Sequence, residues 1–166
     1  MPKLIKNGEL VQDNWTVLRE ATGPDVLTAA PGKNFIVPLK FWKMYQDKLE
    51  DYFGDIAIWL DSDENVNDIG SDLRQFTLIA LNFPVFSDGR SYTNARELRQ
   101  HLNYEGEIRA IGDVLRDQMF YMARCGFDCF EIRHDQDPDA CLSAFNDFQT
   151  GYQSSIDEPN PLFRRR

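Results

Sequence analysis

Arginine and aspartate side chains are concentrated in the segment 83–117, within a chain that is otherwise acidic. A guanidinium donates paired hydrogen bonds that match the oxygens of sulfate, phosphate or a carboxylate. The start of a helix adds free backbone N–H groups, and Arg90 lies where a helix is expected to begin. We therefore predict a site for a small oxyanion in this segment. Its candidate residues are Asp88, Arg90, Tyr92, Arg96, Arg109, Asp113, Arg116 and Asp117.

The same arginines also have an ordinary structural interpretation, which the sequence leaves open. Arg96 and Arg99 would then be solvated residues of a surface helix, and Arg90 would pair with Asp88. Arg109 lies in an expected strand, where a covering helix would bury it in an ion pair. Whether the arginines converge on one pocket therefore depends on the tertiary structure.

A divalent cation is a second possibility, because carboxylate oxygens are the ligands that hard cations prefer. Asp61 and Asp63 follow one expected strand, and Asp113 follows another. However, Asp61 and Asp63 are equally typical of a turn, and Asp113 is typical of a helix cap. No tight ligand spacing accompanies these residues, so the turn and cap roles are favoured over a metal site.

The three cysteines, Cys125, Cys129 and Cys141, form no motif for a redox centre. No C-x-x-C pair is present, and the spacing suits neither zinc nor an iron–sulfur cluster. The glycine-rich loops that bind dinucleotides or nucleoside phosphates are also absent. His101 and His134 have no evident Ser or Cys partner for a catalytic triad. No cofactor is therefore evident, and we expect buried, unreactive thiols.

A β-hairpin and five strand–helix units are expected to position these side chains. Asn7-Gly8 suits the positive φ angles of a tight turn between strands at 3–6 and 9–11, and a third short strand is expected at 15–18. Apolar runs predict five further strands that alternate with amphipathic helices. These strands are expected at 35–37, 55–60, 76–81, 107–111 and 127–132, and the helices at 38–53, 66–74, 91–102, 113–125 and 138–152.

This alternation predicts an α/β fold with about five parallel strands. We expect a three-layer, doubly wound sheet that carries the N-terminal hairpin, and a partial or distorted β/α barrel is the alternative. In either arrangement the loops after the strands meet at one edge, where ligands usually bind. One domain is expected over 1–156, with the hairpin and first strands in 1–20, the repeats in 35–152 and a flexible tail at 157–166.

The composition of the chain indicates its cellular compartment and excludes some classes of binding partner. The formal net charge of −9 over 166 residues argues against a nucleic-acid-binding protein. No apolar run reaches the roughly 20 residues needed to cross a bilayer, and the N-terminal sequence has no signal core. The odd number of cysteines fits reduced thiols, so the sequence indicates a cytoplasmic protein with no nucleic-acid or membrane partner. The free edge of the hairpin leaves homo-oligomerisation open.

Several motifs resemble those of a bacterial domain-of-unknown-function family, family 934. The resemblance covers nearly the whole chain up to about residue 152, and its central motifs are the most specific. The matching residues are Asp61–Glu64, Phe83–Tyr92, Ala95-Arg96, Leu98-Arg99, Gly106–Gln118 and Arg124–Asp128, together with Asn7-Gly8 and Asp13–Trp15.

The resemblance implies a role in assimilatory sulfite reduction and cysteine biosynthesis. Members of the family are described as oxidoreductases involved in sulfite reduction and are often encoded beside the sulfite reductase haemoprotein. This chain lacks the cysteines that would hold an iron–sulfur cluster or sirohaem, so we do not expect it to be the reductase. We expect an accessory protein that assists the haemoprotein through the arginine-rich segment or the terminal Arg164–Arg166. The alternative is a small oxidoreductase or oxyanion-binding component whose site is the arginine–aspartate cluster.

Overall fold

The computed structural model describes residues 3–20, 23–85 and 87–147, with side chains placed up to residue 143. The expected flexible tail at 157–166 and the end of the expected last helix, at 148–152, lie outside the described residues. Among the described helices, none combines the length and the apolar character that crossing a bilayer requires.

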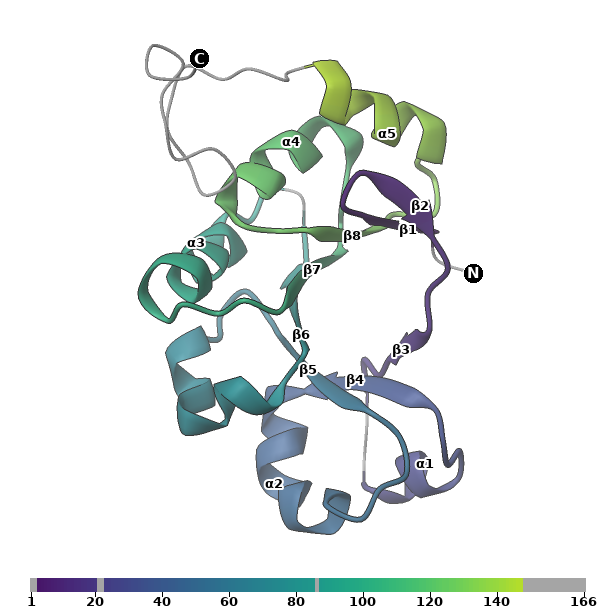
Figure 1. Cartoon of the computed structure of the whole chain (residues 1–166), viewed down its shortest axis with the longest axis vertical. Coiled ribbons are helices and arrows are strands. Elements are labelled where there is room, and N and C mark those ends of the chain that lie inside the picture. The colour runs from purple at the N-terminus through teal and green to yellow at the C-terminus, as the bar shows by residue number, and fades with distance from the viewer. Residues whose placement is uncertain (1–2, 21–22, 86, 148–166) are drawn as a thin grey trace.

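The described strands form one eight-stranded sheet in the order β2-β1-β8-β7-β6-β5-β4-β3. The strands β3 to β8 are parallel to one another, whereas β1 is antiparallel to both β2 and β8. Figure 1 shows this sheet curled into an open half barrel. The strands are β1 (Lys3–Lys6), β2 (Glu9–Val11), β3 (Trp15–Val17), β4 (Asn34–Pro38), β5 (Ile56–Leu60), β6 (Leu78–Phe83), β7 (Glu107–Gly112) and β8 (Cys129–Ile132).

Helices cover the outer face of this half barrel (Figure 1). Apolar side chains from alternate strand positions meet the apolar stripes of the helices there, and together they form the main core. The segments are α1 (Asp25–Thr28), α2 (Leu39–Leu49), the 3₁₀ segment η1 (Val66–Gln75), α3 (Arg90–Arg96), its π-helical continuation η2 (Glu97–His101), α4 (Arg116–Cys125) and α5 (Pro138–Asp147).

The inner face of the sheet carries a second, smaller apolar cluster to which no described helix contributes. It contains residues of β4 to β7, with Trp15 and Val17 of β3 packed against it. Because no described helix covers this face, side chains from the strands and from the segments joining them must fill it. Its buried members are Ile36, Ala57, Trp59, Leu78, Ala80 and Ile111.

Local signals located the strands well. Asn7 and Gly8 have φ angles of 52° and 80°, as the predicted tight turn requires. Gly126 ends α4 with a φ of 121°, which confirms its predicted place just after the helix. Strand β6 is buried at every position, in agreement with the continuous apolar run that predicted it.

Two features of the predicted sheet are corrected. Six strands are parallel instead of about five, because the short strand β3 pairs with β4 and joins the parallel sheet. The parallel strands follow each other in chain order, so the arrangement is a partial barrel, the alternative prediction, in place of a doubly wound sheet. A doubly wound sheet needs a reversal of strand order to place helices on both faces, and this order has none.

Neither α3 nor α4 has a side-chain cap at its start. Helix α3 begins at Arg90 after Gly89, and no side chain caps it. The hydroxyl of Ser91, in the first turn of α3, donates to the backbone oxygen of Asn82 at 2.7 Å and so does not cap the helix. Helix α4 begins at Arg116 after Leu115, so Asp113 lies ahead of the helix and does not cap it.

Gly112 allows a close approach between the ends of β6 and β7. Its φ is +93°, and a Cβ at this position would lie 2.4 Å from the backbone oxygen of Phe83 and 2.5 Å from Oδ1 of Asn82. The backbone N–H of the next residue, Asp113, donates to that same Phe83 oxygen at 2.8 Å. Only glycine fits here without moving the strand ends.

We expect Gly112→Ala to lower the free energy of unfolding by about 2–4 kcal/mol, because it combines a positive φ with a steric overlap. Gly8→Ala is the matched control, since Gly8 also has a positive φ but a Cβ there would meet no other atom within 4 Å. The control should lose about 1 kcal/mol. Urea unfolding monitored by tryptophan fluorescence measures both changes, and equal losses would contradict the role given to the strand ends.

Candidate functional site

Polar side chains meet where the parallel strands end, as predicted from the topology. Asn82, a buried residue of β6, links the carboxylate of Asp61 to a guanidinium from the segment after β3. Nη1 of Arg19 donates to Oδ1 of Asn82 at 2.8 Å, and Nδ2 of Asn82 donates to Oδ1 of Asp61 at 3.0 Å. The guanidinium of Arg19 also lies over the ring of Trp59, 5.3 Å from the ring centroid. These contacts fix one cation and one anion at the edge of the half barrel.

Asp88 and Arg90 form a second pair at this edge. The guanidinium of Arg90 holds both oxygens of the Asp88 carboxylate, with Nε–Oδ1 at 3.1 Å and Nη2–Oδ2 at 2.8 Å. Nη2 also donates to the hydroxyl of Ser62 at 3.0 Å. The backbone N–H of Arg90 donates to Asp88 Oδ1 at 3.1 Å, so a carboxylate of the protein already lies at the start of α3.

The bonds from Arg90 and from Ser62 hold the pKa of the Asp88 carboxyl well below its usual range. Asp88 therefore carries its charge at any physiological pH. Arg90 itself remains 61% exposed, so this edge presents to solvent a guanidinium whose orientation is already set.

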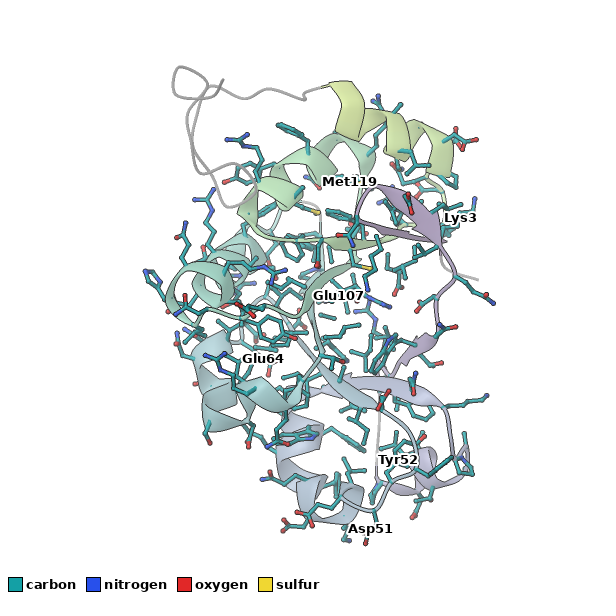
Figure 2. All side chains as sticks on the ribbon, in the orientation of Figure 1. Lys3, Asp51, Tyr52, Glu64, Glu107 and Met119 are labelled. Atoms are coloured by element: carbon teal, nitrogen blue, oxygen red, sulfur yellow. The ribbon has the colours of Figure 1, made fainter. Side chains whose placement is uncertain are left out.

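Arg109 lies on the inner face of the sheet, where it is shielded from solvent. Its side chain is only 2% exposed. Nη1 donates to Oδ1 of Asp13 at 3.0 Å, and Nε donates to Oε2 of Glu107 at 3.1 Å. Lys6 of β1 pairs with the other oxygen of Glu107 at 2.8 Å. Figure 2 shows Glu107 near the middle of the curled sheet, where these four charges form one network.

Tyr92 and Arg96 lie on the helix-covered side, where they join α3 to α4. The ring of Tyr92 packs edge-on against Phe83 and Tyr121, with centroids 5.1 and 4.9 Å away. Burial raises the pKa of Tyr92 to about 12, so the phenol stays neutral. Nη2 of Arg96 donates to the hydroxyl of Tyr121 at 2.9 Å, and Nε donates to Sγ of Cys125 at 3.4 Å.

The three remaining predicted residues surround the start of α4. Asp113 pairs with Arg133 at 3.5 Å. Nε of Arg116 donates to the backbone oxygen of Ala140 at 2.9 Å, which ties α4 to α5. Asp117 is 91% exposed and lies 3.8 Å from Arg116.

The predicted residues thus fall into separate groups. Asp88 and Arg90 meet at the carboxyl edge, and Arg109 lies in the inner network. Tyr92, Arg96 and Arg116 join helices on the outer face. Asp113 and Asp117 lie on either side of the start of α4. Each of Arg90, Arg109 and Arg116 has partners of its own, and the described contacts link none of these three guanidiniums to another.

Several polar residues of these networks were not candidate site residues in the sequence analysis, among them Asn82, Asp13, Arg19 and Lys6. Asn82 had the clearest signal, because it is an amide inside a strand that is otherwise wholly apolar. Asp13 and Arg19 flank a short strand and Lys6 ends one, and charged residues are ordinary at such positions and give no signal. Their roles come from pairings with residues far away in the chain.

The metal candidates and the cysteines of the described residues form no recognisable site. Within the described residues, no group of three or more His, Cys, Asp or Glu side chains is placed to hold a metal ion. Of the weak metal candidates, Asp61 bonds to Asn82 and Asp113 pairs with Arg133. Asp63 is exposed. The three cysteines are unpaired and buried, and burial raises the pKa of the Cys129 thiol to about 12.

The inner ion network gives a stability prediction. We expect Asp13→Asn to lower the free energy of unfolding by about 3 kcal/mol, because it removes one partner of a buried charge. An asparagine keeps an oxygen for the Trp15 N–H, which donates to Asp13 Oδ1 at 2.9 Å, so the change isolates the charge. Asp117→Asn, at an exposed ion pair, should change stability by less than about 0.5 kcal/mol. Chemical denaturation compares the two, and equal small effects would contradict the buried network.

A comparison with known proteins adds the family. Residues 57–163 match the family model described as "Bacterial protein of unknown function (DUF934)". No curated protein and no solved structure shows significant similarity to the chain. The matched residues make up more than half of the chain and include β5 to β8, the Asp88–Arg90 pair and Arg109. The chain therefore belongs to the DUF934 family of bacterial proteins of unknown function.

Proposed function

We propose that this protein is a non-catalytic accessory of assimilatory sulfite reduction that binds the sulfite reductase haemoprotein. The pathway and the partner come from the resemblance of its motifs to a family linked with sulfite reduction. The carboxyl edge of the half barrel is the surface that we assign to this contact. The geometry of Arg90 is the observation that carries the assignment.

Arg90 has the properties of an interface anchor. Asp88 and Ser62 hold its guanidinium in one orientation, and yet the side chain is largely exposed. Arginine is enriched among the residues that dominate binding energy at interfaces, and an ordered side chain loses little entropy when it binds. Val85, in the loop that leads to Arg90, is 50% exposed and adds an apolar contact beside the charge.

The alternative function, a small oxidoreductase or an oxyanion-binding component, has less support from the geometry. The Asp88 carboxylate already accepts the N–H group at the start of α3 and both sides of the Arg90 fork. An added oxyanion would have to displace that carboxylate or bind beside it. The buried thiols likewise favour a binding role over a thiol-based reaction.

The test is a titration of the full-length protein against the purified sulfite reductase haemoprotein at low salt, followed by calorimetry. The wild-type protein should form a complex, and Arg90→Ala should weaken it about 30-fold, the effect of about 2 kcal/mol at a hot-spot residue. Arg74→Ala, which changes an exposed arginine of η1, is the control and should bind as the wild type does. Absence of a complex with the wild type would overturn the proposal.

A second titration separates the two functions. Sulfite, sulfate and phosphate are added to the wild-type protein and to Arg90→Ala, Arg116→Ala and Asp88→Asn. Saturable binding that Arg90→Ala abolishes and Asp88→Asn strengthens would favour the oxyanion site, because the amide no longer competes for Arg90 with a full charge. No binding of any of these anions would count against that site.

A further inference from the structure

We propose that the open side of the half barrel binds a small zwitterionic molecule, one that carries an amine and a carboxylate on an apolar body. A cavity of about 570 Å³ lies there, between the β1–β2 hairpin and β3. This volume is in the range of small-molecule sites. The inference does not rest on the proposed accessory function, because Arg90 and the loop before it take no part in this cavity.

The cavity exists because two strands that are neighbours in the chain lie at opposite ends of the sheet. β2 and β3 are the two outermost strands in the strand order, and only residues 12–14 join them. This short segment passes across the opening of the half barrel but cannot fill it. Figure 2 shows Lys3 on the hairpin side of the opening.

The walls of the cavity are apolar on both sides of the opening. Leu4 and Val11 line it from the hairpin, and Trp15 and Val17 line it from β3. Trp15 is only partly buried although it packs against the inner cluster, so part of its ring can receive a ligand. An indole and branched aliphatic side chains favour a flat or apolar body.

One carboxylate in the cavity, that of Glu131, is attracted by cations without touching one. Glu131 of β8 lines the cavity, and within the described part of the chain its side chain has no hydrogen bond and no ion pair. The neighbouring acids, which are partly buried, differ, since Asp13 pairs with Arg109 and Glu107 pairs with both Lys6 and Arg109. Burial raises the pKa of Glu131 and the negative charge of Asp13 adds to this effect, whereas the positive charges of Arg19 and Arg109 oppose it. A desolvated carboxyl group of this kind is satisfied by an ammonium group or another hydrogen-bond donor.

Cations without carboxylate partners among the described residues lie at the same cavity. Arg19 lines it and gives one donor to the Asn82 amide, but none of the described ion pairs includes Arg19. The stacking of Arg19 on Trp59 orients the plane of its guanidinium. Lys3, at the rim, likewise has no described ion pair. The Arg19 guanidinium and the Glu131 carboxylate attract each other but form no described ion pair, so each can bind one end of a ligand. Together with the apolar walls, they make the cavity complementary to a zwitterion with an apolar body.

The test uses three probes that share one phenyl body. L-phenylalanine carries both charges, phenethylamine only the amine, and 3-phenylpropionate only the carboxylate. Each is titrated up to about 20 mM, which detects millimolar affinity, into the full-length protein, with backbone amide shifts as the readout. L-phenylalanine should shift the amides of β3 and of the hairpin in a saturable way. Each singly charged probe should bind about tenfold more weakly, as expected from the loss of one charge-assisted contact.

Variants assign the two ends of the site. Arg19→Gln should weaken the binding of L-phenylalanine and 3-phenylpropionate but leave that of phenethylamine unchanged. Glu131→Gln should weaken the binding of L-phenylalanine and phenethylamine but leave that of 3-phenylpropionate unchanged. Arg74→Gln and Glu50→Gln, at exposed positions outside the cavity, are matched controls and should bind as the wild type does. The proposal is overturned if no probe binds, or if all three bind equally and neither Arg19→Gln nor Glu131→Gln matters.

Discussion

A buried guanidinium on the helix-free side of the sheet is the constraint on which the rest of the structure depends. Arg109 lies in the middle of β7, and its charge can be buried only if carboxylates meet it with good geometry. One carboxylate, that of Glu107, comes from its own strand, and the other, that of Asp13, comes from the segment joining β2 to β3. Lys6 extends the network to β1. The ion network therefore ties the hairpin, the central strands and the segment that crosses the opening.

This network follows from the shape of the sheet. All the parallel strands run in chain order and the described helices lie on the outer face, so none of them supplies an apolar cover for the inner one. The inner face is closed partly by a small apolar cluster and partly by paired charges. A paired charge needs one specific partner, whereas an apolar side chain can pack against many others. The network therefore favours one position of the hairpin and of the segment 12–14 relative to β7. The half barrel nevertheless remains open between the hairpin and β3. Within the described residues, charged side chains without ion-pair partners lie at this opening.

Arginines serve three physical roles in this protein. On the outer face Arg96, Arg99 and Arg116 donate to backbone oxygens, a hydroxyl and a thiol, and so hold helices and loops together. On the inner face Arg109 compensates carboxylates. At the carboxyl edge Arg90 is held rigid and left exposed, which suits contact with another molecule. Only the surroundings distinguish these roles, since the side chains are chemically the same.

The sequence by itself determined the local features. Apolar runs located five of the eight strands, and Asn7-Gly8 predicted the hairpin turn. Asp88 and Arg90 are close enough in the chain to pair without help from the rest of the fold. Such features depend on backbone preferences and on neighbours within a few residues. The single-domain boundaries and the partner remain predictions from sequence.

Only the tertiary structure decided how distant segments meet. Asp13 and Arg109 are 96 residues apart, and Arg19 and Asn82 are 63 residues apart, so no local pattern could pair them. The choice between a doubly wound sheet and a half barrel rested on the order in which the parallel strands pair, and the apolar pattern of a strand does not say which strand lies beside it. Strand pairing, sheet curvature and the open cavity arise from contacts summed over the whole chain. Only the folded structure therefore shows that the arginines of the segment 83–117 occupy three different environments, at the carboxyl edge, on the inner face and between helices.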